Sequence, residues 1–414
     1  MDIRITPKKL SGAVTPPPSK SQAHRLLIAA ALINSGVSVI HGLVDSRDIL
    51  ATRRCLSALG ARIDDVDENT VQVCGLGSAI VEAGPAPILD CGESGSTLRF
   101  LIPLALLVNG SACFVGHGRL MERPLKPYED LFREKGIAWE RKDGVLTVDG
   151  GKGYDDYALS PGEYRLPGNV SSQFFTGLLF VLPLLDGDST LVPTTPLESR
   201  DYLEMTRSVL ELAGVESRWE GDVLHIPGCQ RYAPFEATVE ADWSQAAFWY
   251  AAIALGSKLE LEGLNAFSVQ GDMAVVPHFL RLTHPGDLTI DLSDIPDLLP
   301  PLAVMAAVRS GTTRFVNAAR LRMKESDRLS TVCAMLTALG GRCEEGPDSL
   351  TVTGGTLTGG TVDSAGDHRI AMAAAIAAIG CTGPVTVLGA ECVKKSYPDF
   401  WEVYQSLGGE VHVL

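Results

Sequence analysis

Two patterns of hydrophobic and polar residues recur along the chain, and each predicts a different kind of helix. In the first pattern, an amphipathic segment reaches a glycine, and the alternating residues after the glycine predict a short strand. Glycine is favoured at such helix ends because the backbone turns left-handed there. The five glycines of this pattern are Gly60, Gly136, Gly214, Gly340 and Gly408. We expect a weaker sixth copy near residues 279–292, in the longest interval between them.

In the second pattern, a polar or glycine-rich cluster is followed directly by an almost wholly apolar helix. The six clusters occupy residues 19–25, 92–97, 169–173, 242–245, 295–297 and 366–369. A helix that is apolar on every side is buried, whereas an amphipathic helix lies on the surface. The chain therefore predicts six repeats of roughly 70 residues, which is a longer period than that of ordinary solenoids. Each repeat has one buried helix, one surface helix and several short strands, and six repeats divide naturally into two domains of three.

Composition narrows the classes of function. The formal net charge of −15 argues against nucleic acid or an anionic membrane as the main partner, because both favour a basic surface. The longest apolar runs are shorter than the roughly 20 residues of a membrane-spanning helix. Nine cysteines occur without CxxC pairs or ligand spacing, so we expect neither disulfides nor a metal site. The first residues have no signal-peptide pattern, and we expect a cytoplasmic protein.

The polar clusters predict an anion-binding site. Each lies at the N-terminus of a buried helix, where unpaired N–H groups and the helix dipole favour negative charge. Cations lie in or beside the clusters: Lys20, Arg25, Arg99, Arg119, Lys324, Arg328, Arg369 and Lys395. Neutral donors suited to phosphate oxygens accompany them: Ser21, Ser171, Ser172, Gln173 and Ser199. Two acids, Asp297 and Glu325, lie among these cations, where they should stay ionised and suit proton transfer.

The motifs resemble those of EPSP synthases. PSKSQAHR, DCGESGSTLRF, GRLMERP, SSQ, SRDYLE, IPD, RMKESDR, DHRIAM and KKSYPDF occur in the family's order over essentially the whole chain. The resemblance implies an α/β (α+β) fold, a two-domain inside-out α/β barrel in which each domain has three βαβαββ repeats with buried parallel helices. It implies a discontinuous domain of residues 1–18 and 240–414, a second domain of residues 19–239, and an active site in the cleft between them.

The resemblance also implies a reaction. The enolpyruvyl (1-carboxyvinyl) group of phosphoenolpyruvate passes to the 5-hydroxyl of shikimate 3-phosphate, which gives 5-enolpyruvylshikimate 3-phosphate and phosphate. This is a step of the shikimate pathway toward chorismate and the aromatic amino acids. The family implies no metal, no organic cofactor and no partner beyond the two small-molecule substrates, and we expect a monomer.

Matching positions imply roles for particular residues. For shikimate 3-phosphate the family implies Lys20, Ser21, Arg25, Ser171, Ser172, Gln173, Ser199, Asp297 and Lys324. For phosphoenolpyruvate it implies Lys20, Gly95, Arg119, Gln173, Arg328, Arg369 and Lys395. The catalytic residues are then Asp297, which takes the proton of the 5-hydroxyl, and Glu325 with Lys20, which deliver a proton to the methylene carbon.

The chain departs from the family at several positions. Pro18 replaces the usual Gly, Arg320 a common Asn, and Glu93 an Asn near phosphoenolpyruvate. A carboxylate at position 93 should weaken anion binding or pair with an arginine such as Arg99. The mixed form of the SRDYLE motif leaves the role of Tyr202 open.

Two alternatives remain. UDP-N-acetylglucosamine enolpyruvyl transferase has the same implied fold and donor, but most members carry a reactive cysteine in the loop near Arg119. That loop has none here, and we expect Cys113, which precedes it in an apolar strand-like run, to be a buried structural thiol. The other alternative is a non-catalytic anion-binding relative, which would not need Lys20, Asp297 and Glu325.

Overall fold

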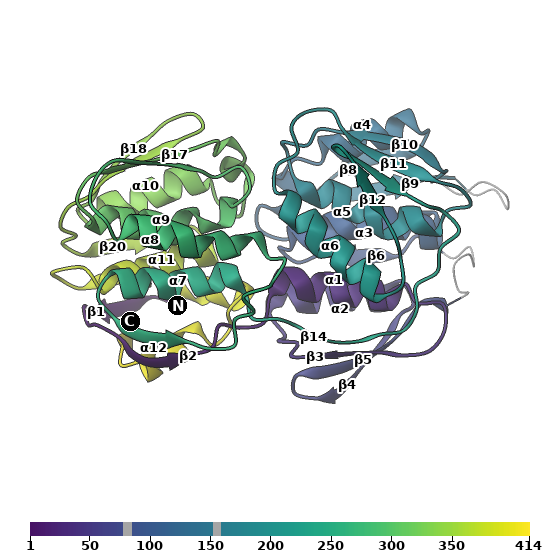
Figure 1. Cartoon of the computed structure of the whole chain (residues 1–414). Helices are drawn as coiled ribbons and strands as arrows, with labels where there is room; N and C mark the ends of the chain where they lie inside the picture. Colours follow the sequence, from purple (N-terminus) through teal and green to yellow (C-terminus); the bar gives the residue numbers. More distant parts are fainter. Residues whose placement is uncertain (78–84, 152–158) are drawn as a thin grey trace. The chain divides into compact units, whose positions relative to one another are not determined.

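The computed structural model describes residues 1–77, 85–151 and 159–414. The chain forms two compact units, which we call unit 1 (Met1–Pro17 and Glu240–Leu414) and unit 2 (Pro18–Val239). Each unit is built from repeated segments of helix and strand (Figure 1). The predicted mixed α/β class, with two sets of repeats, is confirmed by this architecture.

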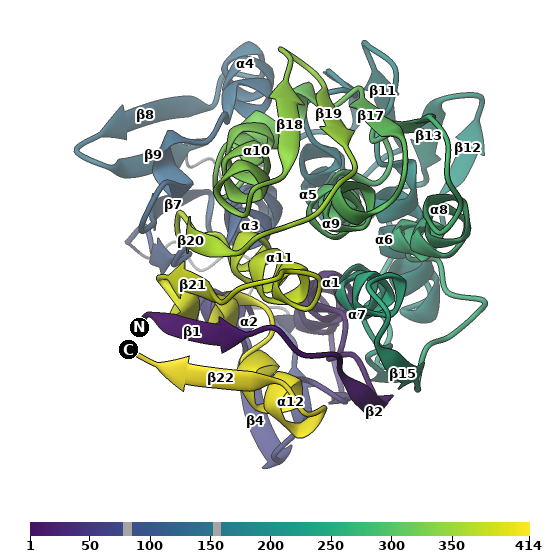
Figure 2. The same ribbon diagram turned by 90° about the vertical axis from the view of Figure 1, so that its left-hand side faces the viewer.

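In the described part of the chain, six buried helices form the inside of the two units, three in each. They are α1 (Lys20–Ala31), α3 (Gly95–Asn109), α5 (Ser172–Val181), α7 (Trp243–Ala254), α9 (Leu299–Val308) and α11 (His368–Ala378). All eleven residues of α11 are buried, as are thirteen of the fifteen in α3. Figure 2 looks nearly along the axes of α7, α9 and α11 and shows them end-on, surrounded by strands of unit 1. Each buried helix begins at one of the six predicted polar clusters.

The amphipathic helices flank this interior. They are α2 (Arg47–Ala58), α4 (Lys126–Glu134), α6 (Arg200–Leu212), α8 (Val275–Leu282), α10 (Arg328–Ala338) and α12 (Phe400–Ser406). The five predicted glycines follow α2, α4, α6, α10 and α12, and each has the expected positive φ, between 76° and 109°. The hydrophobic pattern therefore predicted both series of helices correctly.

Five four-stranded sheets share one arrangement, in which a parallel pair continues into antiparallel strands. In unit 2 the strand orders are β14-β3-β5-β4, β6-β7-β9-β8 and β10-β11-β13-β12, and in unit 1 they are β16-β17-β19-β18 and β20-β21-β1-β22. The strands of unit 2 are β3 (Ser38–His41), β4 (Arg62–Asp67), β5 (Thr70–Cys74), β6 (Ile88–Asp90), β7 (Ser111–Val115), β8 (Ala138–Lys142), β9 (Val145–Asp149), β10 (Gly162–Leu166), β11 (Ser189–Pro193), β12 (Arg218–Glu220), β13 (Val223–Ile226) and β14 (Glu236–Thr238). Those of unit 1 are β1 (Ile3–Thr6), β16 (Leu288–Asp291), β17 (Thr312–Val316), β18 (Arg342–Glu345), β19 (Leu350–Thr353), β20 (Gly360–Asp363), β21 (Val385–Leu388) and β22 (Glu410–Val413).

The sixth repeat is reduced, as its weaker pattern suggested. Its sheet has two parallel strands, β2 (Ser11–Val14) and β15 (Lys258–Leu261). The predicted surface helix is α8, but the strand predicted after it, β16, pairs with β17 and belongs to the next sheet. The N-terminal strands β1 and β2 both complete sheets of unit 1, which explains why residues 1–17 belong to that unit.

Polar residues cap the buried helices. The side chains of Ser19, Ser94, Ser171, Asp242 and Asp367 accept hydrogen bonds from first-turn N–H groups of α1, α3, α5, α7 and α11. These caps satisfy part of the orphan donors of each helix, which a buried helix cannot leave to water. None of the described helices combines the length and apolarity needed to cross a lipid bilayer.

Candidate active site

Three polar segments of unit 1 come together around one arginine. The cluster, which we call the unit 1 cluster, consists of Asp297, Lys324, Glu325, Arg328, Asp367 and Arg369. Its members come from the 3₁₀ segment η5 (Pro296–Leu298), the residues just before α10, and the first turns of α10 and α11. Three cations and three carboxylates therefore meet near the starts of α9 and α10, which belong to one repeat, and of α11, which belongs to the next.

Arg328 is the centre of this cluster, and its side chain is only 2% exposed. Its Nε donates to Asp367 at 2.9 Å, its Nη1 to Asp297 at 2.8 Å and its Nη2 to Glu325 at 2.7 Å. A second bond from Nη2 reaches Asp367 at 3.3 Å, so carboxylates occupy four of the five guanidinium donors. Burial alone would lower the pKa of Arg328, but Asp367, Glu325 and Asp297 raise it above its ordinary value. Arg328 thus orients the two predicted catalytic acids.

Asp297 is surrounded by cations. Its carboxylate lies 3.3 Å from Lys324 Nζ, 2.8 Å from Arg328 Nη1 and 3.2 Å from Arg369 Nη2. Burial acts to raise the pKa of Asp297, but the three cations outweigh it and hold that pKa well below the ordinary range. Asp297 is therefore ionised near neutral pH and able to accept a proton, as the sequence analysis expected for an acid among cations.

Arg369 connects the cluster to α7. Its Nη2 donates to Ser244 Oγ at 2.8 Å, and Ser244 in turn donates to the N-cap residue Asp242 at 2.6 Å. Lys395 is buried at the end of the 3₁₀ segment η7 (Ala390–Lys395). The neighbouring Ser396 accepts a hydrogen bond from Gln245 of α7 at 3.1 Å. Arg369 thus joins the starts of α11 and α7, and Lys395 is next in sequence to a residue that α7 contacts.

A second group of predicted residues gathers at the helix starts of unit 2. Lys20, in the first turn of α1, donates to Asp48 of α2 at 2.9 Å, and both side chains are largely buried. Arg25, one turn later on α1, is 2% exposed and bonds only neutral oxygens in its three recorded contacts: Thr206 Oγ1 and the carbonyls of Ser21 and Tyr202. Burial lowers the pKa of Arg25 to about 10, so its guanidinium still keeps its charge near pH 7.

Gly95 begins α3 beside two guanidinium groups. A Cβ at this position would lie 2.7 Å from Arg123 Nη1 and 3.1 Å from Arg99 Nη1. Arg99 donates to Gln173 Oε1 at 2.7 Å, and Gln173 Nε2 donates to Ser96 Oγ at 3.0 Å. The N-terminus of α3, two arginines and Gln173 of α5 are therefore grouped as an anion receptor. We call this group the α3 anion site.

The predicted serines lie at neighbouring helix starts of the same unit. Ser171 is the N-cap of α5, and the buried Ser172 is its first helical residue. Ser199 precedes α6 and is buried, with φ 56° and ψ 44°. This left-handed conformation is unfavourable for a residue with a Cβ, and such strain is often found at functional sites. Tyr202, whose role the sequence left open, packs its ring 5.8 Å from the Arg25 guanidinium carbon.

The sequence matches a known protein family and its curated members over nearly its whole length. The family model for EPSP synthase (3-phosphoshikimate 1-carboxyvinyltransferase) matches residues 5–404. The 3-phosphoshikimate 1-carboxyvinyltransferases of Clostridium novyi and Clostridium kluyveri are 41% and 44% identical to the chain, with 99% of this chain and 98% of each relative covered.

The chain belongs to the EPSP synthase family.

Two solved structures agree with this family in fold. An EPSP synthase from Acinetobacter baumannii has a TM-score of 0.79 at 24% identity, with both chains fully covered. The enolpyruvyl transferase NikO from Streptomyces tendae has a TM-score of 0.78 at 20% identity, with 99% of this chain and 98% of that chain covered.

Membership confirms the enolpyruvyl transferase of the shikimate pathway expected from the motifs. EPSP synthases are enzymes that use shikimate 3-phosphate and phosphoenolpyruvate. Family membership favours this function over a UDP-N-acetylglucosamine enolpyruvyl transferase and over a non-catalytic relative. The expectation that Cys113 is buried is wrong. Cys113 is only partly buried, because it lies on the outward side of β7, where its thiol is 3.6 Å from Thr147 Oγ1.

The structure does not bring every predicted residue of this EPSP synthase family member into a cluster. Arg119 lies in the segment before the 3₁₀ turn η2 (Leu120–Glu122), with a side chain 53% exposed and Nε 3.7 Å from Glu122. Glu93 lies near this segment, since a Cβ on Gly118 would be 3.2 Å from the Glu93 carboxyl carbon.

Several residues that hold the members of each group in place, each within its own unit, were not predicted from the sequence. They are Asp48, Ser96, Arg123, Ser244 and Asp367. All but Asp48 lie in or beside a quoted motif or polar cluster, so the available signal was their position next to a predicted ligand.

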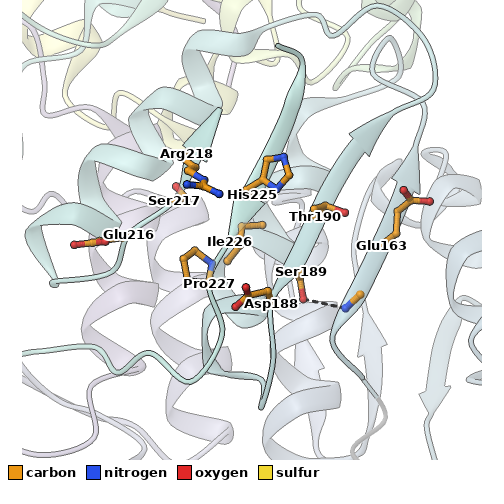
Figure 3. Close-up of a pocket in the computed structure, with 11 residues that line it drawn as sticks. Glu163, Asp188, Ser189, Thr190, Glu216, Ser217, Arg218, His225, Ile226 and Pro227 are labelled. Atoms are coloured by element: carbon orange, nitrogen blue, oxygen red, sulfur yellow. Dashed lines mark hydrogen bonds between the residues drawn. The ribbon is translucent and has the colours of Figure 1, made fainter. Parts of the chain in front are cut away.

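A separate hollow of about 470 Å³ lies on the sheet β10-β11-β13-β12. Figure 3 shows Glu163, Thr190 and His225 on neighbouring strands and Asp188 at its edge. It contains none of the predicted site residues, and its lining mixes acids with Arg218 and His225. Among the described residues there is no group of three or more His, Cys, Asp or Glu that could hold a metal ion.

Proposed function

We propose that the chain transfers the enolpyruvyl group of phosphoenolpyruvate to the 5-hydroxyl of shikimate 3-phosphate through the residues of the two groups described above. The observation that supports this assignment most strongly is the state of Asp297. A carboxylate that three cations keep ionised, next to a second acid on the same arginine, is suited to proton transfer. A protein that only binds anions would gain nothing from this carboxylate, because its negative charge repels the ligand.

The proposed reaction has two stages. Asp297 takes the proton of the 5-hydroxyl, and the oxygen forms a bond to C2 of phosphoenolpyruvate while the Lys20 ammonium, with Glu325 as a relay, delivers a proton to the methylene carbon. This gives a tetrahedral intermediate. The intermediate then loses phosphate: the bond between C2 and the phosphate oxygen breaks, and the leaving phosphate takes the proton held by Asp297. The methyl carbon returns one proton through Glu325 to Lys20, which restores the carbon–carbon double bond. Atoms balance without an oxidant, a metal or a cofactor.

The remaining residues bind the two anions in this proposal. Shikimate 3-phosphate is bound by Lys20, Ser21, Arg25, Ser171, Ser172, Gln173, Ser199, Asp297 and Lys324. Phosphoenolpyruvate is bound by Lys20, Arg119, Gln173, Arg328, Arg369 and Lys395, with Gly95 close against it. Neutralising two polyanions and holding them in contact supplies both the entropic and the electrostatic part of the rate enhancement.

Arg123 is an addition to this set that the geometry supports. Its Nη1 is the atom nearest to a Cβ at Gly95, so it lies directly beside the predicted phosphoenolpyruvate position. Arg119, whose side chain is half exposed, has to move toward the substrate to bind it. We further propose that residues of both units bind the same pair of substrates, and that the protein acts as a cytoplasmic monomer.

Phosphate release from phosphoenolpyruvate tests the proposal, with shikimate 3-phosphate or UDP-N-acetylglucosamine as the acceptor. We expect release only with shikimate 3-phosphate, and a loss of roughly 10²- to 10⁴-fold in kcat for Asp297→Asn. The matched control is Asp130→Asn, because Asp130 pairs with Lys126 at 2.7 Å on the surface, with a side chain 60% exposed. Full activity of Asp297→Asn would refute its role, and release only with the sugar nucleotide would refute the acceptor.

A further inference from the structure

Four buried polar side chains form a continuous chain of hydrogen bonds through three helices of unit 2. His24 Nδ1 of α1 lies 2.8 Å from Thr52 Oγ1 of α2, and Thr52 Oγ1 lies 2.7 Å from Thr97 Oγ1 of α3. Thr97 Oγ1 lies 2.7 Å from Ser94 Oγ, the N-cap of α3. All four residues are 0% exposed. Polar groups are buried in such a run only when each is satisfied by its neighbour.

The direction of every bond in this chain follows from its end at α3. The Thr97 hydroxyl donates to Ser94 Oγ, so its oxygen accepts the hydrogen of Thr52. The Thr52 oxygen must then accept from His24, which requires the proton of the ring to be on Nδ1. Burial lowers the pKa of His24 to about 3, so the ring is neutral and has only one proton to place. His24 Nε2 is buried and has no hydrogen-bond partner among the described residues. This agrees with a ring whose proton is on Nδ1, because Nε2 then has no hydrogen to donate.

This run of hydrogen bonds ends at the first turn of α3, where the N–H donors of the α3 anion site begin. Ser94 accepts the N–H of Thr97 through its side chain at 3.2 Å and the N–H of Leu98 through its carbonyl at 3.1 Å. The Ser94 N–H donates to the Cys91 carbonyl at 2.9 Å. Of the four N–H groups that a helix leaves unpaired at its start, those of Gly95 and Ser96 therefore have no intrahelical partner here. The orientation of Ser94 therefore sets the direction in which these two donors point.

The other end of the chain lies one turn from Lys20. Lys20 and His24 are four residues apart on α1, and their partners Asp48 and Thr52 are four residues apart on α2. Two contacts thus join α1 to α2, and the second continues to α3. The run that reaches the α3 anion site therefore starts one helical turn from a predicted catalytic lysine on α1.

We propose that His24, Thr52 and Thr97 are positioning residues, which fix the first turn of α3 for phosphoenolpyruvate through a directed chain of hydrogen bonds that begins at one tautomer of His24. The proposal rests on the assignment of the α3 anion site to phosphoenolpyruvate under the proposed function. It adds three buried residues, which contact no substrate, to those on which phosphoenolpyruvate binding depends.

Thr97→Val tests the chain, because valine has the shape of threonine but neither donates nor accepts. We expect the KM for phosphoenolpyruvate to rise roughly five- to tenfold, the effect of one to one and a half kcal/mol. The KM for shikimate 3-phosphate should change less than about twofold, a shift worth under half a kcal/mol. Thr97→Ser keeps the hydroxyl and should restore the wild-type value. The control is Thr313→Val in β17, which removes a hydroxyl that is also 0% exposed and also accepts one side-chain hydrogen bond.

The tautomer of His24 gives a second measurement that does not depend on activity. Nitrogen-15 spectra of histidine-labelled protein should show the proton of His24 on Nδ1 in the wild type. In Thr97→Val the Thr52 hydroxyl loses its acceptor and turns to His24 Nδ1, so the ring proton should move to Nε2. A wild-type proton on Nε2, or an unchanged phosphoenolpyruvate KM in Thr97→Val, would overturn the proposal. A wild type with the expected tautomer but no phosphate release would count against the proposed function instead.

Discussion

Arg328 and Asp367 form an ion pair inside unit 1, with Nε 2.9 Å from Oδ2 and side chains only 2% and 0% exposed. The carboxylate also caps α11 by accepting the N–H of Arg369 at 3.0 Å, and it accepts from Ser326 Oγ at 2.9 Å. One buried acid therefore fixes the start of α11 and the side chain that orients Asp297 and Glu325.

Asp367→Asn should destabilise the protein strongly. Removing one partner of a buried pair leaves the other charge undercompensated, which typically lowers the free energy of unfolding by about 3 kcal/mol or more. Urea unfolding followed by circular dichroism measures the loss. Asp130→Asn, which breaks an exposed pair on α4, should leave the unfolding midpoint unchanged. Equal midpoints for Asp367→Asn and the wild type would show that the pair is not a stabilising element.

His24 should make stability depend on pH below neutrality. Burial lowers its pKa from 6.5 to about 3, so between these values the unfolded chain binds a proton that the folded protein does not. The contribution is fully present above pH 6.5 and is lost at about 1.4 kcal/mol per pH unit as the pH falls. His24→Asn keeps an N–H donor near the position of Nδ1 but does not titrate. The stabilities of wild type and variant should therefore converge or cross as the pH falls from 6 to 4, and curves that stay parallel would contradict the buried neutral ring.

Much of the fold was predictable because burial has a local signature. Apolar segments with no polar face gave the inner helices, and amphipathic segments ending in glycine gave the outer ones. The strand partners were not predictable in this way. Ile3 of β1 pairs with Val387 of β21 and Val413 of β22, and no local pattern indicates partners about 400 residues away.

In the candidate site, too, features of the local sequence were predictable and contacts between distant segments were not. Asp297, Glu325 and Arg328 were predicted because acids and cations occurred together at helix starts. Hydrogen bonds between helices of different repeats, such as Arg99 to Gln173 or His24 to Thr52, depend on how the helices pack, and periodicity gives no information about that. Charged residues at helix starts were therefore easier to predict than the residues that position them.

Ser199→Gly should stabilise the protein and weaken substrate binding. Glycine removes the backbone strain of the left-handed conformation at φ 56°. Glycine also raises the entropy of the unfolded chain, which offsets part of this effect, so the free energy of unfolding should rise by about 0.5–1 kcal/mol. Loss of the hydroxyl should raise the KM for shikimate 3-phosphate roughly fivefold, as expected for one hydrogen bond. Asp143→Gly, at φ 51° in the turn between β8 and β9, should give a similar gain with unchanged KM. An unaltered KM in Ser199→Gly would remove Ser199 from the binding residues.

Gly95→Ala should affect phosphoenolpyruvate specifically. The new Cβ would come within 2.7 Å of Arg123 Nη1 and 3.1 Å of Arg99 Nη1, and both guanidinium groups must move away. Because these atoms are the ends of flexible side chains, the protein should still fold, but the α3 anion site should lose affinity.

We expect the KM for phosphoenolpyruvate to rise roughly tenfold in Gly95→Ala, which corresponds to about 1.4 kcal/mol, with little change for shikimate 3-phosphate. Initial-rate kinetics with each substrate varied in turn measure both constants. Gly355→Ala is the matched control, because its Cβ would meet only Arg342 Nη2 at an ordinary 3.6 Å. If both constants rise equally in Gly95→Ala, the two arginines beside Gly95 do not act on phosphoenolpyruvate alone, and the division of residues between the two substrates has to be redrawn.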